Sequence, residues 1–315
     1  MFIQYLILII GLGLLWGGAE LLIRYSSIIA HSLGVSPMII GLTIVSIGTS
    51  LPEFVVSLVA AVQNTMGISL GNIIGSNIAN IGLILGIGAV LSTLPVKKEW
   101  VSKEVPIMLF FTVVFTIFAR TGYDLNRIEG AVLLIFLITF LAYLSHTSLI
   151  QMQEHSLSNS AQKLQSKQKL EYILLTGAGI VLMIIGSKLT VNSGTLIAEN
   201  LGVSDTVIGL TLIAVGTSLP ELATTIVGII KKETDIVVGN VIGSNIFNLL
   251  FIGGAVSVIR PIRVPHGMFH VDFIFLLGIS LIVWPIMRFR WSIGKIEGFI
   301  LLFLYALFIT ITFLE

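Results

Sequence analysis

The sequence contains no cysteine, and this absence excludes disulfide bonds, thiolate metal sites and cysteine nucleophiles. Charged residues are scarce as well: Asp, Glu, Lys and Arg make up 10% of the 315 residues, whereas 56% are hydrophobic and the mean hydropathy is +1.05. A water-soluble domain of this length needs far more charge to cover its surface. We therefore predict a membrane protein. The net charge of +1 carries no information about a partner, and neither nucleic acid nor a protein partner is expected.

Histidine, the other common ligand of zinc and iron, is also rare. The five histidines lie at the ends of hydrophobic segments or between them: His31, His146, His155, His266 and His270. None of them belongs to an HExxH pair, the motif of an intramembrane metalloprotease. We therefore expect neither an enzyme nor a resident cofactor.

Long hydrophobic segments dominate what is present. A membrane-spanning helix needs about 20 apolar residues, and ten segments approach or exceed this length. They cover residues 2–30, 37–62, 68–91, 104–120, 127–146, 170–198, 206–230, 236–259, 269–287 and 293–313. The first segment has no basic n-region, so we interpret it as a helix and not as a cleavable signal peptide. The predicted fold class is an all-α polytopic membrane protein with ten transmembrane helices.

The chain also repeats itself. A shift of 168 residues places Leu33–Glu53 on Leu201–Glu221, with 14 of 21 positions identical. The same shift places GNIIGSNIAN, residues Gly71–Asn80, on GNVIGSNIFN, residues Gly239–Asn248. Solenoid repeats are about 20 to 50 residues long. A period of half the chain therefore indicates the duplication of a whole five-helix unit.

Basic residues are distributed unevenly between the two sets of loops. Twelve lie beside the loops that follow odd-numbered helices: Arg24, Lys97, Lys98, Lys103, Lys163, Lys167, Lys169, Lys231, Lys232, Arg288, Arg290 and Lys295. The other loops hold four: Arg120, Arg127, Arg260 and Arg263. By the positive-inside rule the first set is cytoplasmic, and an even number of helices then places both termini outside.

Because each half has an odd number of helices, the two halves enter the membrane from opposite sides and form inverted repeats. The predicted division is a first inverted repeat over residues 1–146, a cytoplasmic linker over 147–169 and a second inverted repeat over 170–315. We expect an integral protein of the plasma or inner membrane.

Polar residues concentrate inside the repeated segments, at spacings i, i+3, i+4 and i+7 that fall on one helix face. The positions are Ser46, Thr49, Ser50 and Glu53 in the first half, and Ala214, Thr217, Ser218 and Glu221 in the second. Pro52 and Pro220 lie within these stretches, and a proline removes a backbone donor and bends a helix. We therefore expect freed carbonyl groups beside each glutamate.

Two pairs at i, i+4 on the following helices add more oxygen ligands: Ser76 with Asn80, and Ser244 with Asn248. Calcium takes six to eight oxygen ligands, and sodium is served by neutral oxygens and unwound carbonyls. Glu53 and Glu221 lie near the middle of their spans, where an ionised side chain costs about 3 kcal/mol on insertion scales. A bound cation would offset that cost.

Simpler interpretations apply to some of these residues. A single Ser or Thr in a membrane helix more often packs or bonds to its own backbone, and glycine rows usually form helix contacts. The duplication of GTSLPE argues against such a role for the two glutamates. For Asn72, Asn77, Asn240 and Asn245, packing and an outer layer around the ion ligands both stay open.

The motif GTSLPE followed by GNIIGSNIAN in one half, and by GNVIGSNIFN in the other, resembles the two alpha repeats of prokaryotic-type sodium/calcium exchangers in the cation/calcium antiporter superfamily. The resemblance covers the whole chain and implies alternating access. It implies these ion ligands: the side chains of Thr49, Ser50, Glu53, Ser76, Asn80, Thr217, Ser218, Glu221, Ser244 and Asn248, and the carbonyls of Ser46 and Ala214.

The resemblance also implies a secondary antiporter in which sodium and calcium share the two glutamates. The hydroxyls of GTSLPE, where proton-coupled members carry a GNxxE pattern, favour sodium coupling. Asn80 and Asn248 are neutral, whereas potassium-dependent members and some prokaryotic ones carry Asp at one of these positions. One calcium ion balances two carboxylates and three sodium ions leave +1, so a 3:1 exchange is electrogenic. A proton-coupled exchanger of calcium or another divalent cation, and a cation channel, are the alternatives.

Overall fold

The computed structural model describes residues 2–157, 166–201 and 214–314, and these residues are helical apart from connections and four two-residue strands. They form two compact units. The first contains Met1–Thr49 and Leu144–Asn240, and the second contains Ser50–Tyr143 and Val241–Glu315. Each unit therefore combines segments from both halves of the sequence repeat. The division into inverted repeats over 1–146 and 170–315 stays a prediction about topology.

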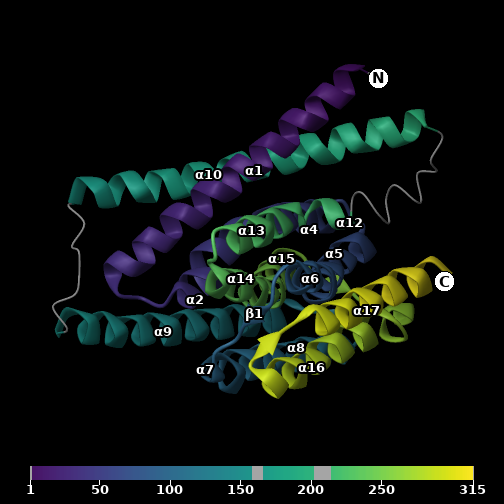
Figure 1. Cartoon of the computed structure of the whole chain (residues 1–315). Coiled ribbons are helices and arrows are strands. Elements are labelled where there is room, and N and C mark those ends of the chain that lie inside the picture. The colour runs from purple at the N-terminus through teal and green to yellow at the C-terminus, as the bar shows by residue number, and fades with distance from the viewer. Residues whose placement is uncertain (1, 158–165, 202–213, 315) are drawn as a thin grey trace. The chain divides into compact units, whose positions relative to one another are not determined.

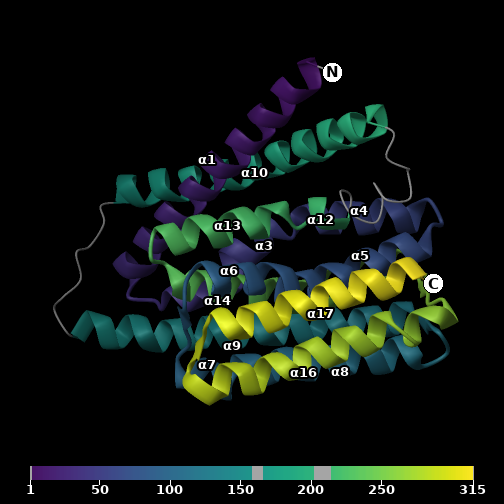
Figure 2. The same cartoon turned by 45° about the vertical axis from the view of Figure 1, so that its right-hand side comes forward.

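The first unit is built on two long helices and a set of short ones. Its elements are α1 (Phe2–Leu33), α2 (Pro37–Ile40), the π-helix η1 (Gly41–Val45), α3 (Ser46–Thr49), the end of α9 (Arg127–Leu157), α10 (Ser166–Asn200), α12 (Ala214–Gly216), α13 (Leu219–Ile230) and the start of α14 (Thr234–Phe247). α1 and α10 cross and pack against each other, as both views show (Figure 1 and Figure 2).

Glycines allow the close approach of α1 and α10. A Cβ atom on Gly18 would lie 2.6 Å from the carbonyl oxygen of Gly179, and one on Gly186 would lie 2.7 Å from that of Gly11. Contacts this short exclude any larger residue unless the backbone shifts. A shift of 168 residues takes Gly11 to Gly179 and Gly18 to Gly186, so each of the two contacts is the repeat equivalent of the other. The helix pair is therefore packed with two-fold symmetry.

The second unit contains the remaining helices and all four strands. Its elements are α4 (Leu51–Val62), α5 (Met66–Ala79), the π-helix η2 (Asn80–Leu85), α6 (Gly86–Leu91), β1 (Leu94–Pro95), α7 (Lys98–Ser102), α8 (Glu104–Arg120), β2 (Asp124–Leu125), the start of α9, the end of α14, the π-helix η4 (Asn248–Ile252), α15 (Gly253–Ile259), β3 (Ile262–Arg263), the 3₁₀ turn η5 (His266–Phe269), α16 (Asp272–Arg290), β4 (Ser292–Ile293) and α17 (Lys295–Leu314).

The strands pair across the repeat. β1 pairs with β4, with Leu94 opposite Ile293, and β2 pairs with β3, with Leu125 opposite Ile262. Adding 168 to 94 gives 262, and subtracting 168 from 293 gives 125, so each pair becomes the other under the shift. A two-fold arrangement of duplicated halves produces this exchange.

The same symmetry extends to backbone conformation. Among the described residues, four that are not glycine have positive φ: Asn64 (64°), Tyr123 (57°), Lys232 (62°) and Trp291 (52°). They form two pairs separated by 168 positions, Asn64 with Lys232 and Tyr123 with Trp291. Positive φ is uncommon for such residues. The duplicated turns have therefore kept their conformation although the side chains differ.

Eight helices in the described part of the chain are long and apolar enough to span a membrane, and Pro37–Thr49 with Leu51–Val62 forms a ninth as a broken span. The predicted seventh span, 206–230, begins within residues 202–213, which lie outside the described residues, so the count of ten stays a prediction. α9 and α10 extend into the predicted linker, because 147–157 and 166–169 contain neither glycine nor proline. Residues 158–165 are outside the described part.

The helices that carry the GNxIGSN motif are the most enclosed. In the 18-residue apolar stretch of Met66–Leu91 and in that of Thr234–Ile259, 78% is buried inside the protein. The corresponding share is 17–39% in the other six long spans. These two helices therefore carry their polar side chains away from lipid.

Candidate cation-binding site

Each GTSLPE motif interrupts its helix at the serine. Ser50 has φ −84° and ψ 4° between α3 and α4, and Ser218 has φ −89° and ψ 9° before α13. Pro52 and Pro220 then lie in the first turn of the new helix, where a missing N–H costs no helical hydrogen bond. The expected disturbance is present, but it is a break before the proline and not a bend of a continuous helix.

The break places both glutamates at the start of a helix. Glu53 lies in the first turn of α4 and Glu221 in the first turn of α13, and both side chains are 0% exposed. The N-terminus of a helix carries a partial positive charge that stabilises a nearby carboxylate. The local fold therefore reduces the cost of burying each negative charge.

In the first unit, a chain of hydrogen bonds connects the two GTSLPE segments. The Thr49 hydroxyl lies 3.3 Å from the carbonyl oxygen of Ser46 and donates to Asn240 Oδ1 at 3.1 Å. Asn240 Nδ2 donates to Thr224 Oγ1 at 3.1 Å, and Thr224 Oγ1 donates to the carbonyl oxygen of Glu221 at 2.9 Å. Asn240 thus fixes Thr49 relative to the backbone of Glu221.

The equivalent asparagine, Asn72, bonds to α4 in the second unit. Asn72 Nδ2 donates to the carbonyl oxygen of Glu53 at 3.1 Å and to Ser57 Oγ at 2.9 Å. Of the two roles left open for Asn72 and Asn240, these contacts support positioning of the segments that carry the candidate ligands. Thr224 and Ser57 were not among the predicted site residues, because a lone hydroxyl in a membrane helix has no distinctive sequence pattern.

A second pair of asparagines, Asn80 and Asn245, lies entirely within the second unit. Asn80 Nδ2 donates to Asn245 Oδ1 at 3.3 Å, and Asn245 Nδ2 lies 3.6 Å from Met108 Sδ on α8. Asn77 Nδ2 donates to the carbonyl oxygen of Ile73 in its own helix at 2.7 Å. Asn245 therefore orients a candidate ligand, whereas Asn77 bonds to its own helix.

The candidate ligands Asn80 and Asn248 each begin a π-helical segment, η2 and η4, and η1 ends directly before Ser46. Short π-helical turns are rare and occur often at functional sites. The regular periodicity of apolar residues gives no sign of them in the sequence. They shift the register of the helix at the candidate ligand positions.

Several of these buried polar atoms make no hydrogen bond to any described residue. They are both amide atoms of Asn248, Oδ1 of Asn80 and Oγ of Ser76, on side chains at most 2% exposed. Most buried polar atoms in proteins have a partner, and leaving one without costs about 1–3 kcal/mol. An oxygen-coordinated cation would supply a partner for the three oxygen atoms, whereas the Nδ2 donor of Asn248 would need an acceptor.

The predicted ligands divide between the two units. The first holds Ser46, Thr49, Ala214, Thr217, Ser218 and Glu221, and the second holds Ser50, Glu53, Ser76, Asn80, Ser244 and Asn248. The eleven whose side chains are described are at most 8% exposed, and of Ala214 only the backbone at the start of α12 is described. Burial of every described member fits a shared role. Their assembly into one cage stays a prediction.

Comparison with known proteins identifies the family of this chain. The family model described as sodium/calcium exchanger protein matches residues 3–145 and 171–314. The sodium/calcium exchanger MaX1 of Methanosarcina acetivorans is 34% identical over 351 aligned positions, covering 99% of both proteins. The inner membrane protein YrbG of Escherichia coli is 36% identical, with 88% of this chain and 86% of that protein covered.

A solved structure of the sodium-calcium exchanger NCX_Mj, soaked with 2.5 mM Na⁺ and 0.1 mM Ca²⁺, has a TM-score of 0.83 at 32% sequence identity and covers 98% of each chain. The family match includes both GTSLPE motifs and both GNxIGSN motifs. The chain is therefore an all-α polytopic membrane protein that belongs to the sodium/calcium exchanger family.

Proposed function

We propose that this protein is a secondary antiporter that exchanges sodium for calcium across the membrane by alternating access. The observation that carries the proposal is the duplicated buried glutamate: Glu53 and Glu221 each follow a helix break in the same motif and are 0% exposed. The similarity to two sodium/calcium exchangers, MaX1 and NCX_Mj, which align along nearly the whole chain, supports the same conclusion.

The ligand chemistry supports calcium as one cargo. Two carboxylates together with hydroxyl, amide and carbonyl oxygens form the oxygen-rich set that calcium prefers. One calcium ion neutralises two carboxylates. Three sodium ions would leave a net charge of +1, and the neutral oxygens of Ser76, Asn80, Ser244 and Asn248 suit additional sodium ions. An exchange of three sodium ions for one calcium ion would therefore be electrogenic.

A proton-coupled exchange is less well supported than sodium coupling. Asn80 and Asn248 are neutral, so Glu53 and Glu221 are the only acidic members of the candidate ligand set. The family similarity also favours sodium as the coupling ion. For the orientation, we infer from the basic loops that both termini face outside. The similarity to the inner membrane protein YrbG supports a location in the plasma or inner membrane.

The test is calcium-45 uptake into sodium-loaded proteoliposomes, with and without an outward sodium gradient. We expect the gradient to drive uptake that saturates with calcium. Glu53→Gln and Glu221→Gln should each abolish it, because each removes half of the negative charge of the site. Glu99→Gln, the same change on an exposed residue of α7, is the matched control.

Uptake driven equally well by a proton gradient without sodium would favour the alternative coupling. Non-saturating calcium flux without any counter-ion would indicate a channel. Wild-type uptake in both glutamate variants would contradict the ligand assignment.

A further inference from the structure

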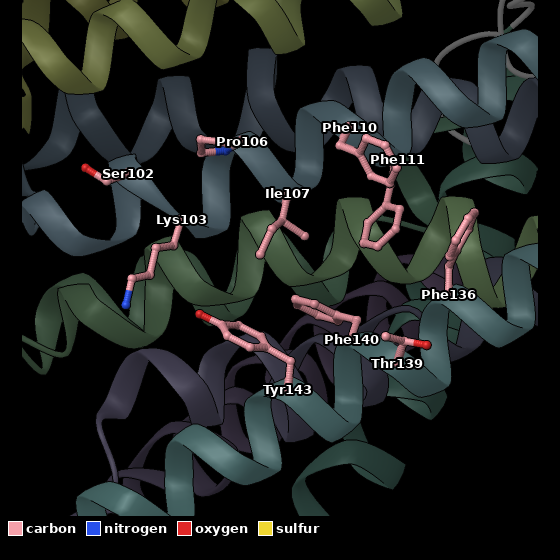
Figure 3. Close-up of a pocket in the computed structure, with 10 residues that line it drawn as sticks. All are labelled: Ser102, Lys103, Pro106, Ile107, Phe110, Phe111, Phe136, Thr139, Phe140 and Tyr143. Atoms are coloured by element: carbon pink, nitrogen blue, oxygen red, sulfur yellow. The ribbon is translucent and has the colours of Figure 1, made fainter.

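A groove of about 700 Å³ lies between α8 and α9 in the second unit, well separated in sequence from the GTSLPE motifs (Figure 3). Its wall is mostly aromatic and aliphatic, and its polar residues are few. Lys103 and Tyr143 lie toward the same end of the groove in Figure 3, and the phenylalanines lie toward the other. The groove is therefore amphipathic along its length.

Phenylalanines close the apolar end. The ring of Phe111 on α8 lies 5.8 Å from that of Phe136 and 6.2 Å from that of Phe140, both on α9, measured between ring centroids. Phe110 also lies 6.2 Å from Phe136 and is 55% exposed. At this end, the space between α8 and α9 is filled by a single layer of aromatic rings. A protein helix about 10 Å wide does not fit such a wedge, but a hydrocarbon chain does.

The open end carries a cation. Lys103 connects α7 to α8 with φ −126° and ψ −66°, and its side chain is exposed. Its ammonium group forms no ion pair or side-chain hydrogen bond with any residue in the described ranges. Seven residues separate Lys103 from Phe110, which at 1.5 Å per helical residue is about 10 Å. The charged end and the apolar end are thus about 10 Å apart, a distance that lies within one leaflet of a bilayer whose hydrocarbon core is about 30 Å thick.

Nearby residues place the cationic end at a membrane interface. Trp100 on α7 lies beneath the ammonium group of Lys97, 5.1 Å from its ring centroid, and Tyr143 lines the groove at the same level as Lys103. Tryptophan, tyrosine and lysine are enriched where hydrocarbon meets headgroups. The groove therefore runs from headgroup depth toward the hydrocarbon core.

We propose that this groove binds an anionic phospholipid, with the phosphate group at Lys103 and one acyl chain against Phe111, Phe136 and Phe140. The membrane around the protein supplies this ligand, and an anionic headgroup complements the unpaired lysine. The inference does not depend on sodium/calcium exchange. It adds a lipid site to the second unit.

The groove also contacts the ion site indirectly. Met108 lies on α8 between groove residues Ile107 and Phe111 of that helix, and its sulfur atom accepts from Asn245, which in turn accepts from Asn80. A lipid that holds α8 in place therefore stabilises the contact behind a candidate ion ligand.

The absence of cysteine allows a direct test in the full-length protein. A Thr139→Cys variant carries a fluorophore inside the groove, and an Ile138→Cys variant carries it on the neighbouring exposed position, which is 67% exposed and outside the groove. Both are reconstituted into phosphatidylcholine vesicles that contain phosphatidylglycerol. Bromine atoms on the acyl chains quench the fluorophore. In one sample the phosphatidylglycerol is brominated and in the other the phosphatidylcholine is brominated, and both samples contain the same total amount of bromine.

We expect brominated phosphatidylglycerol to occupy the Thr139→Cys position about fivefold more than brominated phosphatidylcholine, as one basic residue near an anionic headgroup predicts. The Ile138→Cys position should show no preference. Adding Lys103→Gln should abolish the preference, whereas Lys98→Gln, the same change on an exposed lysine of α7 outside the groove, should keep it. Equal quenching by the two lipids at Thr139→Cys, or a preference unchanged by Lys103→Gln, overturns the proposal.

Because the label itself occupies space, native mass spectrometry of unlabelled protein gives an independent measurement. Wild type and Lys98→Gln should retain phosphatidylglycerol more than phosphatidylcholine, and Lys103→Gln should retain both equally. Equal retention of phosphatidylglycerol by all three proteins contradicts the site even if the label is excluded from the groove.

Discussion

At the residue scale, Asn240 connects three helices of the first unit, since it accepts from Thr49 and donates to Thr224, which bonds to the backbone of Glu221. Asn240→Ala removes both contacts and leaves buried polar groups without partners, at a cost of about 1–3 kcal/mol. We expect the KM for calcium to rise roughly tenfold, measured from the concentration dependence of calcium-45 uptake.

Asn200→Ala is the matched control, because Asn200 is exposed and, within the described residues, its side chain bonds to the carbonyl oxygen of Leu196 in its own helix. Its KM should equal that of the wild type. If both alanine variants keep the wild-type KM, the Asn240 bridge has no part in ion binding.

A substitution at Asn248 distinguishes a packing role from an ion-ligand role for this residue. Both of its amide atoms are buried and bond to no residue in the described part of the chain, so Asn248→Leu should not lower the unfolding temperature in ion-free buffer. Calcium at 100 times its Kd stabilises a protein by about 2.7 kcal/mol. We expect the variant to lose most of this calcium-dependent shift in thermal unfolding.

Ser257→Ala provides the comparison for that experiment. Ser257 is also buried in the second unit with a hydroxyl group that bonds to none of the described residues. This variant should keep the full calcium-dependent shift. An undiminished shift in Asn248→Leu would show that the asparagine is a packing residue.

At the scale of elements, the glycines of α1 and α10 set the distance between the two helices. A Cβ atom on Gly18 meets the Gly179 carbonyl oxygen at 2.6 Å, whereas one on Gly17 meets nothing within 4 Å. Gly18→Ala should therefore destabilise the protein by about 1–3 kcal/mol, and Gly17→Ala should be neutral or slightly stabilising. Thermal unfolding of the two variants measures the difference. Equal melting temperatures would mean that the helices separate at little cost.

The elements also show what the sequence predicts and what it does not. The presence of the long helices and the position of the polar face follow from hydrophobic length and from the duplicated motif, which also pairs Glu53 with Glu221. The ends of α9 and α10 do not, because both helices continue past their apolar segments into the predicted linker. The π-helical turns at Asn80 and Asn248 are not predicted either, because one extra residue in a turn leaves no mark in a fully apolar pattern. The roles of Asn72 and Asn240 do not follow from the sequence, since an amide side chain is equally suited to helix packing and to positioning an ion ligand.

At the scale of the whole molecule, the charge of the cargo determines how exchange responds to voltage. If three sodium ions exchange for one calcium ion, each cycle moves one net charge, worth about 2.3 kcal/mol per 100 mV. We expect calcium uptake to accelerate when an imposed potassium-valinomycin potential is positive inside the proteoliposomes, because the excess positive charge leaves with sodium. Reversing the potential should slow uptake. Flux that ignores the potential would indicate a 2:1 exchange.

The exchanged strand pairs carry a consequence for the origin of the chain. Among the described residues β1 pairs with β4 and β2 with β3, so each ladder takes one strand from either half. A single half produced alone would expose two short strand edges and the glycine faces that meet across the repeat. Such a half could complete its ladders only with a second copy of itself. Fusion of two such copies into one chain would keep these contacts and let the two halves differ in side chain, as Tyr123 and Trp291 do at turns of the same conformation.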